Sequence, residues 1–242
     1  MKVLAFLLLA LAGPAFAVCG DVNGDGAVNI GDALAIAQCD VGLRSCAFPL
    51  ATCGPTPACS LPESGQTTCW DSSGVVIPCA GTGQDGDTRT GRPLVYVDNG
   101  DGTITDMNTS LVWEKKSEDG SIHDISVTYT WAQAFSVHVA GLNAVNFAGH
   151  NDWRVPNVKE LESIVNFEHF YPSPSVSPAF NNGCAPGCTV LTCSCTVVHD
   201  YWSSNTYANT PQLAWVVYFG GGNVNANFKS DPFYVRAVRG GS

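Results

Sequence analysis

The distribution of the cysteines is the feature that most limits what this chain can fold into. Eleven cysteines occur in the 242 residues, in one group from Cys19 to Cys79 and a second group from Cys184 to Cys195. In an oxidising compartment, groups of this kind are typical of disulfides that hold loop-rich segments together. Zinc is an alternative for the second group, although its spacing lacks the Cys-x2-Cys pairs of structural zinc sites. Because eleven is an odd number, we expect one thiol to stay free or to pair with another chain.

The first 17 residues have the pattern of a signal peptide. Lys2 precedes an apolar run that is too short to span a bilayer, and Ala15–Ala17 forms a cleavage motif. No later segment is apolar for about eighteen residues, so we expect no transmembrane segment. The net charge of −10 disfavours nucleic acid and anionic membranes as partners. The sequence therefore predicts a protein that is secreted or held at the cell surface, with the periplasm as the alternative.

Oxygen-bearing residues recur through residues 21–32 at the spacing of a calcium loop. Gly26 stands at the sixth position, where an EF-hand-type loop turns sharply. Calcium prefers six to eight oxygen ligands, so this pattern predicts Ca²⁺ as a cofactor, although a turn cluster without metal is the alternative. The predicted ligands are Asp21, Asn23, Asp25, Ala27 through its carbonyl, Asn29 and Asp32.

The end of this loop is typical of one class of calcium repeat. An EF-hand normally ends its loop with glutamate, whereas this loop ends in Asp32 and continues into Ala33–Ile36. Residues 19–43 thereby resemble a dockerin type I repeat. The resemblance implies calcium binding and a cohesin-like domain as partner, in secreted assemblies that degrade polysaccharides. Dockerins carry two such repeats, and this chain shows one.

The rest of the chain divides into a stapled linker and a globular domain. Residues 44–92 are rich in Cys, Pro and Gly, and the segment from Cys69 to Cys79 has the pattern of a hairpin closed by a disulfide. From residue 93 to 241 the composition is that of a globular domain. It opens with two strand-like runs around the turn Asp98–Gly102, where a second calcium ion is the alternative to a simple turn. Leu111–Lys115 has the pattern of a further strand.

Two helices and more strands follow. Capping boxes at Thr130 and at Asn157 predict helix starts, and the first helix is expected to end near Gly141. Trp153 and Trp202 are expected in the core. Strand-like runs are predicted at 201–204, 214–219 and 234–239. Strands, two helices and then strands make an α+β domain.

Six motifs in this domain occur in the order of one bacterial family. They are Asp98–Asp106, Leu111–Trp113, Trp131–Ala134, Asp152–Leu161, Tyr201–Ser204 and Tyr234–Gly240. By these motifs the chain resembles the C-terminal domain family of the collagen-like adhesin Lcl, whose namesake binds sulfated polysaccharides as a trimer. The resemblance implies a C-type-lectin-like fold in a bacterial protein and a role in adhesion, although this chain lacks a collagen stalk and is acidic.

The C-terminal region offers a candidate binding face for an extracellular glycan or protein ligand. Alternation puts Asn223, Asn225 and Asn227 on one side of a strand, with apolar residues on the other. Asparagine and tyrosine suit such recognition, although a solvated strand over a core face needs no ligand. The composition also resembles the variable region of diversity-generating retroelement targets. The other candidate residues are Ser203, Ser204, Asn205, Tyr207, Asn209, Gln212, Lys229, Asp231 and Tyr234.

Catalytic patterns are missing from the sequence. None of the five histidines has the spacing of a metal-ligand pair, and neither a Gly-x-Ser-x-Gly elbow nor a phosphate loop occurs. We therefore expect a non-enzymatic recognition or adhesion protein, with no catalytic residues. The alternative from another class is a scaffold attachment component that docks through residues 19–43.

Overall fold

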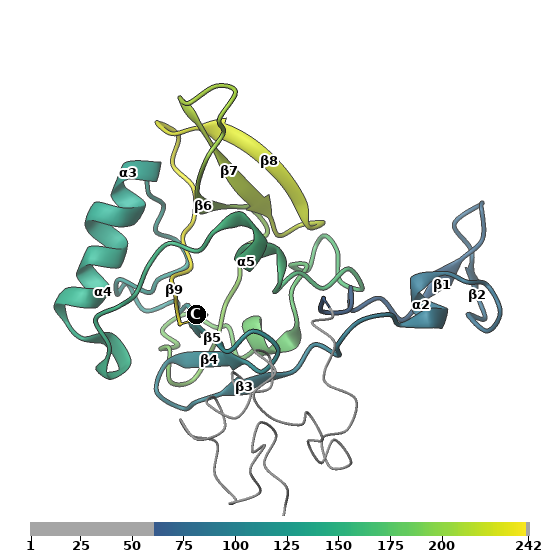
Figure 1. The fold of residues 1–242 in the computed structure, drawn as a ribbon. Coiled ribbons are helices and arrows are strands. Elements are labelled where there is room, and N and C mark those ends of the chain that lie inside the picture. Colours follow the sequence, from purple (N-terminus) through teal and green to yellow (C-terminus); the bar gives the residue numbers. More distant parts are fainter. Residues whose placement is uncertain (1–60, 241–242) are drawn as a thin grey trace, which may run out of the picture. The chain divides into compact units, whose positions relative to one another are not determined.

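The structure, a computed structural model, describes residues 61–240, which belong to one compact unit, Leu61–Ser242 (Figure 1). The predicted signal peptide, the calcium loop and the first part of the linker lie outside the described residues. Among the described residues, no helix combines the length and the apolar character that crossing a membrane requires.

The described chain begins with a small hairpin. β1 (Cys69–Trp70) pairs with β2 (Val76–Ile77), and the short helix α2 (Asp85–Thr88) follows. A disulfide joins Cys69 to Cys79, which confirms the predicted closure of this hairpin. The hairpin is held to the rest of the unit by Glu168, whose carboxylate accepts a hydrogen bond from the backbone N–H of Thr67 at 2.7 Å.

The first sheet has the order β3-β4-β5-β9, and all its pairs are antiparallel. β3 (Tyr96–Asp98) and β4 (Thr103–Asp106) flank the predicted turn, and β5 (Leu111–Glu114) follows as expected. The turn residue Asp98 binds Lys115 Nζ at 2.7 Å. β9 (Val238–Gly240) pairs with β5 and brings the end of the chain beside this sheet.

Two helices start where the capping boxes predict. The first runs through α3 (Trp131–Gln133), the π-helical turns η1 (Ala134–Val139) and α4 (Ala140–Ala144), three residues beyond the predicted end. The second, α5 (Val158–Glu162), follows Asn157, whose Oδ1 accepts a hydrogen bond from the N–H of Glu160 at 2.9 Å. Short 3-10 turns occur at η2 (Phe147–Gly149) and η3 (Pro178–Phe180).

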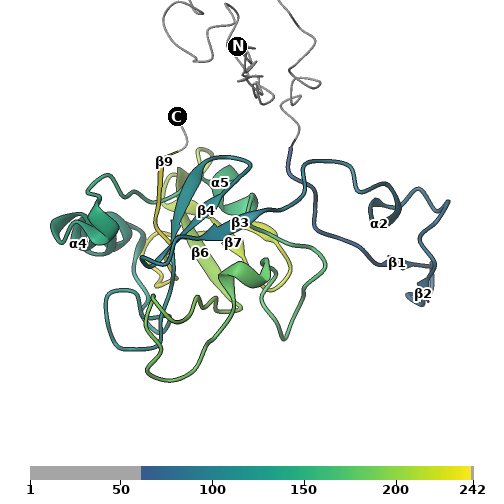
Figure 2. The same ribbon diagram turned by 90° about the horizontal axis from the view of Figure 1, so that it is seen from below.

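The second sheet has the order β6-β7-β8 and is also antiparallel. Its strands are β6 (Asp200–Thr206), β7 (Leu213–Tyr218) and β8 (Asn223–Phe228). The predicted strand at 234–239 is largely wrong, because Tyr234 makes only an isolated bridge to Tyr201 and Val238 pairs with β5. In Figure 2, β3 and β4 lie in front of β6 and β7, so the two sheets form separate layers.

The second sheet has a hydrophobic core on each face. Successive side chains of a strand point to opposite faces. Tyr201 and Val217 therefore belong to one core, called core 1 here, and Trp202 and Val216 belong to the other, called core 2. Core 1 also contains residues of β4, β5 and α5, and core 2 contains residues of the helix at 131–144. Trp153 and Trp202 are buried in core 2 as expected. The domain is thus a mixed α+β fold with antiparallel sheets, as predicted.

The second cysteine group forms disulfides. Cys184 pairs with Cys195, and Cys188 pairs with Cys193. Together with the Cys69–Cys79 bridge, these pairs confirm the disulfide interpretation for the described part of the chain. Such bridges are typical of proteins that reach an oxidising compartment, outside the cell or in the periplasm.

Candidate functional site

The three predicted asparagines line up on β8, the edge strand of the second sheet. Asn225 and Asn227 pair across the sheet with Val216 and Ala214, so they share the face of core 2. Asn223 and Asn225 are exposed, and Asn227 is half-buried. The stripe therefore lies at the rim of the sheet, beyond the part of that face that core 2 covers.

The opposite side of β8 faces core 1 only at one end. Val224 packs against core 1 beside its partner Val217. Ala226 is half-buried opposite Trp215, and 58% of the area of Phe228 is exposed. The apolar residues therefore lie on the opposite side of β8 from the asparagines, as predicted. They are covered by core 1 at Val224 but exposed to solvent at Phe228.

Several other candidate residues are already engaged within the fold. Ser203 is buried, and its hydroxyl donates to the carbonyl of Trp215 at 2.8 Å. Asn205 is exposed, but its Oδ1 accepts from the N–H of Val158 at 2.8 Å and so caps α5. Lys229 donates to Thr206 at 2.7 Å. The remaining candidates are the exposed Asn209 and Gln212 and the half-buried Ser204, Tyr207, Asp231 and Tyr234.

A hollow opens between α5 and the core 1 face of β7 and β8. Its volume is about 320 Å³, and it is lined by Val158, Lys159, Glu162, Trp215 and Val224. Tyr207 meets Trp215 edge to face, with ring centroids 5.0 Å apart. The site thus combines an aromatic surface, an apolar wall and two charged groups. This volume is at the lower end of the range of small-molecule sites.

The indole of Trp215 differs from those of three other tryptophans. The N–H groups of Trp131, Trp153 and Trp202 each donate to a backbone carbonyl. Among the described residues, none accepts a hydrogen bond from the N–H of Trp215, which is only half-buried. Trp215 also lines the hollow, so it is the tryptophan through which a ligand there could be bound.

A second hollow lies on the other side of the same two charged residues. It has a volume of about 380 Å³ and is lined by Leu61, Pro62, Thr109, Lys159, Glu162 and Ser163. Lys159 and Glu162 form an ion pair at 2.6 Å, and 83% of the Lys159 side chain is exposed. The two hollows thus share the Lys159–Glu162 ion pair of α5 in their linings.

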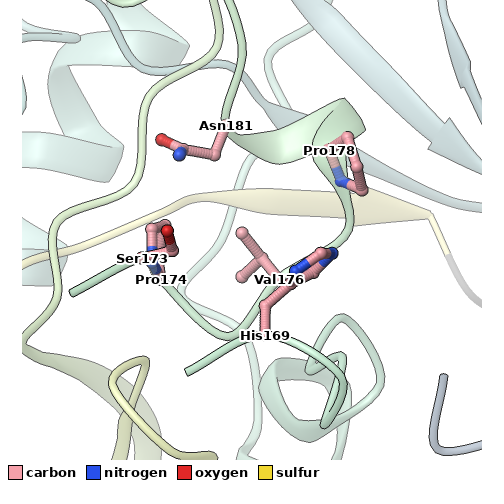
Figure 3. Close-up of a pocket in the computed structure, with 6 residues that line it drawn as sticks. All are labelled: His169, Ser173, Pro174, Val176, Pro178 and Asn181. Atoms are coloured by element: carbon pink, nitrogen blue, oxygen red, sulfur yellow. The ribbon is translucent and has the colours of Figure 1, made fainter. Parts of the chain in front are cut away.

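A third hollow is smaller. Figure 3 shows His169 and Val176 next to each other at this site, with Asn181 across from them. Its volume of about 140 Å³ is well below that of typical ligand sites. Its other lining residues are Ser173, Pro174 and Pro178.

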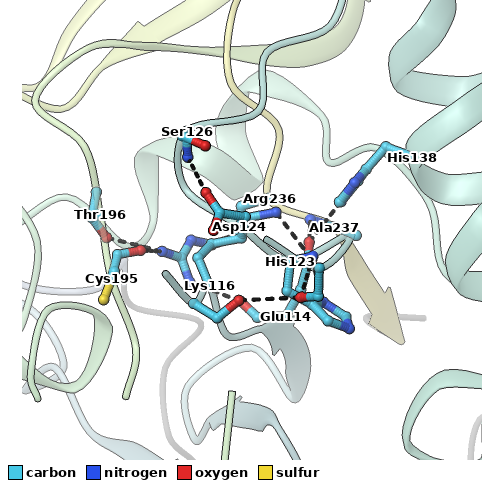
Figure 4. A network of polar contacts seen from close by, with 12 residues as sticks. Glu114, Lys116, His123, Asp124, Ser126, His138, Cys195, Thr196, Arg236 and Ala237 are labelled. Carbon is cyan, nitrogen blue, oxygen red and sulfur yellow. Dashed lines mark hydrogen bonds and ion pairs between the residues drawn. The ribbon is translucent and has the colours of Figure 1, made fainter. Parts of the chain in front are cut away.

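A buried carboxylate forms the densest polar cluster of the described residues (Figure 4). Oε1 of Glu114 accepts from Nδ1 of His123 at 2.8 Å and from Nζ of Lys116 at 3.1 Å. Oε2 accepts from Nε2 of His138 at 2.8 Å and from the N–H of Ala237 at 2.9 Å. Because an ionised carboxylate only accepts, each histidine must donate through the named nitrogen.

The environment fixes the protonation of this cluster. Burial by itself raises the pKa of Glu114, but the interactions with His138 and Lys116 and the hydrogen bonds from both histidines hold that pKa well below its ordinary range. Burial lowers the pKa of His138, and the Glu114 charge opposes this only in part. None of the three hollows is lined by these residues. The cluster therefore joins β5, the helix at 131–144 and the chain before β9.

Arg236 extends this buried cluster towards the disulfides. Its guanidinium donates to the carbonyl of Glu114 at 2.7 Å, to the carbonyl of Cys195 at 2.6 Å and to Oγ1 of Thr196 at 2.9 Å (Figure 4). The arginine side chain is fully buried. It thus anchors the second disulfide loop to the centre of the domain.

Sequence reasoning missed both the hollow and the buried cluster. Trp215 was part of an apolar run predicted as a strand, and only alternation along that run could have separated it from the buried Val216. Glu114 lies within the predicted strand Leu111–Lys115, and nothing in that pattern marks its carboxylate as buried. The position of His138 on the apolar face of its helix was the one available signal.

The family relationship agrees with this domain. Nothing among the curated proteins matches the chain. Residues 102–239 match the Lcl C-terminal domain. This segment contains the buried cluster around Glu114, the whole second sheet and the ion pair of Lys159 and Glu162, which lines two of the hollows. The chain therefore belongs to the Lcl C-terminal domain family.

Proposed function

We propose that this protein is an exported, non-enzymatic recognition protein that binds a glycan through its C-terminal strands. In this proposal residues 93–241 form a C-type-lectin-like domain, and the hollow between α5 and the second sheet is the binding site. The observation that carries the proposal is the half-buried Trp215, which lines that hollow and whose N–H has no hydrogen-bond acceptor among the described residues.

The chemistry of the hollow suits a sugar ring. A sugar has an apolar C–H face and a rim of hydroxyls, and an indole offers an apolar plane with a polar N–H. Lys159 supplies up to three donors and Glu162 two acceptor oxygens at the rim. Val158 and Val224 form apolar walls. A ligand can therefore stack on Trp215 while its hydroxyls bond to the ion pair.

The asparagine stripe of β8 is the competing surface of the same sheet. It points to the face of core 2, whereas Trp215 belongs to the face of core 1. Single substitutions can therefore separate the two surfaces. Asn225→Ala removes an exposed side chain from one face, and Lys159→Ala removes an exposed side chain from the other.

A glycan array screened with residues 18–242, in calcium and again in EDTA, tests the proposal. We expect reproducible glycan binding that Trp215→Ala and Lys159→Ala each abolish or weaken at least about tenfold, a loss of about 1.4 kcal/mol. Asn225→Ala serves as the matched control and should bind like the unaltered protein. Loss of binding in Asn225→Ala alone would move the site to the asparagine stripe.

A blank array would refute the glycan proposal and leave a protein ligand as the next candidate. The predicted calcium loop can be tested in the same material. Deletion of residues 19–43 should spare glycan binding here, whereas a scaffold component would lose capture of a cohesin-like partner. EDTA sensitivity of glycan binding would show whether calcium contributes to recognition.

A further inference from the structure

The second cysteine group places two disulfides in direct contact. Sγ of Cys188 lies 3.9 Å from Sγ of Cys195, although these two cysteines belong to different bridges. The sulfurs of Cys188, Cys193 and Cys195 all lie within 4.8 Å of one another. A thiolate released at Cys195 would therefore start next to Sγ of Cys188. Because all three sulfurs lie so close together, its side chain must rotate to come in line with the Cys188–Cys193 bond before it can attack.

The four cysteines differ in their access to solvent. Cys184 is exposed and Cys188 is half-buried, whereas Cys193 and Cys195 are fully buried. A reductant in solution can therefore reach Cys184 far more easily than Cys193. Exchange between the bridges is one route by which electrons can pass from the surface to Cys193, and attack of a reductant on the half-buried Cys188 is the other.

The surroundings of the sulfurs favour one exchanged product. Carbonyl oxygens lie 3.4 Å from Sγ of Cys184, at Ser194, and 3.2 Å from Sγ of Cys193, at Thr189. A thiol at either position would have an acceptor ready. Sγ of Cys188 and Sγ of Cys195, in contrast, have each other as the hydrogen-bond neighbour among the described residues. Free thiols are thus better accommodated at Cys184 and Cys193 than at Cys195 and Cys188.

We propose that the two bridges form a disulfide relay that accepts two electrons from a dithiol at Cys184 and ends with one thiol at Cys184 and one at Cys193. One thiolate of the dithiol attacks Sγ of Cys184, forms a mixed disulfide and expels the Cys195 thiolate. The Cys195 thiolate attacks Sγ of Cys188, forms a Cys188–Cys195 disulfide and expels the Cys193 thiolate, which takes up a proton.

The second thiol of the dithiol then resolves the mixed disulfide and leaves Cys184 as a thiol. Overall, the dithiol is oxidised to a cyclic disulfide. The protein gains two electrons and two protons, and it changes from two bridges to the single Cys188–Cys195 bridge.

Limited reduction of residues 18–242 with dithiothreitol tests the relay. The reaction is quenched with acid, free thiols are alkylated, and fragment masses locate the label. Chymotryptic cleavage after Leu191 separates the Cys184–Cys188 peptide from the Cys193–Cys195 peptide once they are not cross-linked. We expect label at Cys184 and Cys193, together with a new Cys188–Cys195 cross-link. Label at Cys184 and Cys195, with the Cys188–Cys193 bridge intact, would overturn the relay.

Two controls keep the result interpretable. The Cys69–Cys79 bridge has no neighbouring disulfide in the described structure, so both its cysteines should gain label in equal amounts. In the variant Cys188→Ser with Cys193→Ser, the accepting bridge is removed and the label should move to Cys184 and Cys195. If Cys184 is labelled in this variant but Cys195 is not, the relay is also contradicted.

Discussion

Replacing Glu114 by glutamine should destabilise the domain far more than an ordinary change at a charged residue. Four donors converge on the two carboxylate oxygens of Glu114, which is fully buried. Glutamine keeps one oxygen but introduces an NH₂ group, which would face donors of the cluster. Lys116, of which only 4% is exposed, would lose its opposite charge.

The size of the effect follows from the burial of the pair. Removing one partner of a buried ion pair costs about 3–5 kcal/mol, because the other charge remains buried without compensation. We therefore expect Glu114→Gln to lower the free energy of unfolding by about 3–5 kcal/mol, a large part of the 5–15 kcal/mol that is usual for a domain. Glu162→Gln is the matched control, since its partner Lys159 is 83% exposed, and it should cost about 0.5 kcal/mol or less.

Urea unfolding at neutral pH, without reductant, measures both changes. The buried Trp113, Trp153 and Trp202 report the loss of the two cores through their fluorescence. The midpoint and the slope of each curve give the free energy of unfolding. If Glu114→Gln loses no more stability than Glu162→Gln, the carboxylate charge is not what holds the cluster, and the argument from burial is wrong.

Three further outcomes follow from the sequence and the structure. Burial lowers the pKa of His138 below its ordinary value, so the unfolded chain binds a proton that the folded chain refuses. Stability should therefore fall as pH drops from about 6.5 towards the folded pKa, by up to about 1.4 kcal/mol per pH unit, as urea midpoints would measure. Asn157→Ala removes the cap of α5 and should cost about 1 kcal/mol in the same assay. Calorimetric titration of residues 18–242 with calcium should show one site, which Asp25→Ala abolishes.

Local signals predicted the parts of the fold that depend on neighbouring residues. Each capping box needs only residues three apart, and both Thr130 with Gln133 and Asn157 with Glu160 start a helix as expected. The hairpin turn after Asp98 is equally local. Alternation along β8 also separated its two sides correctly, because it depends only on the geometry of a strand.

Long-range pairing set the features that the sequence did not reveal. Glu114, Lys115 and Lys116 resemble a solvated run, yet all three are buried, because partners as distant in sequence as Ala237 complete the cluster. The hollow at Trp215 depends on where α5 lies against the second sheet. β9 joins the first sheet because β5 offers it a free edge, which no local pattern indicates.

The exposed asparagines of β8 allow a test of the remaining alternative, that a diversity-generating retroelement varies this region. Asn223 and Asn225 are exposed on an edge strand, and surface substitutions of this kind usually change stability by no more than about 0.5 kcal/mol. Ser203, in contrast, is buried and bonded to Trp215, so changes there should disturb the sheet. If a diversity-generating retroelement varies this region, variation should concentrate at the exposed asparagines and spare Ser203. Sequencing the gene with its surroundings tests this, because a near-identical template repeat and a reverse transcriptase must lie nearby. Their absence would rule out this origin and leave the stripe as an ordinary solvated edge.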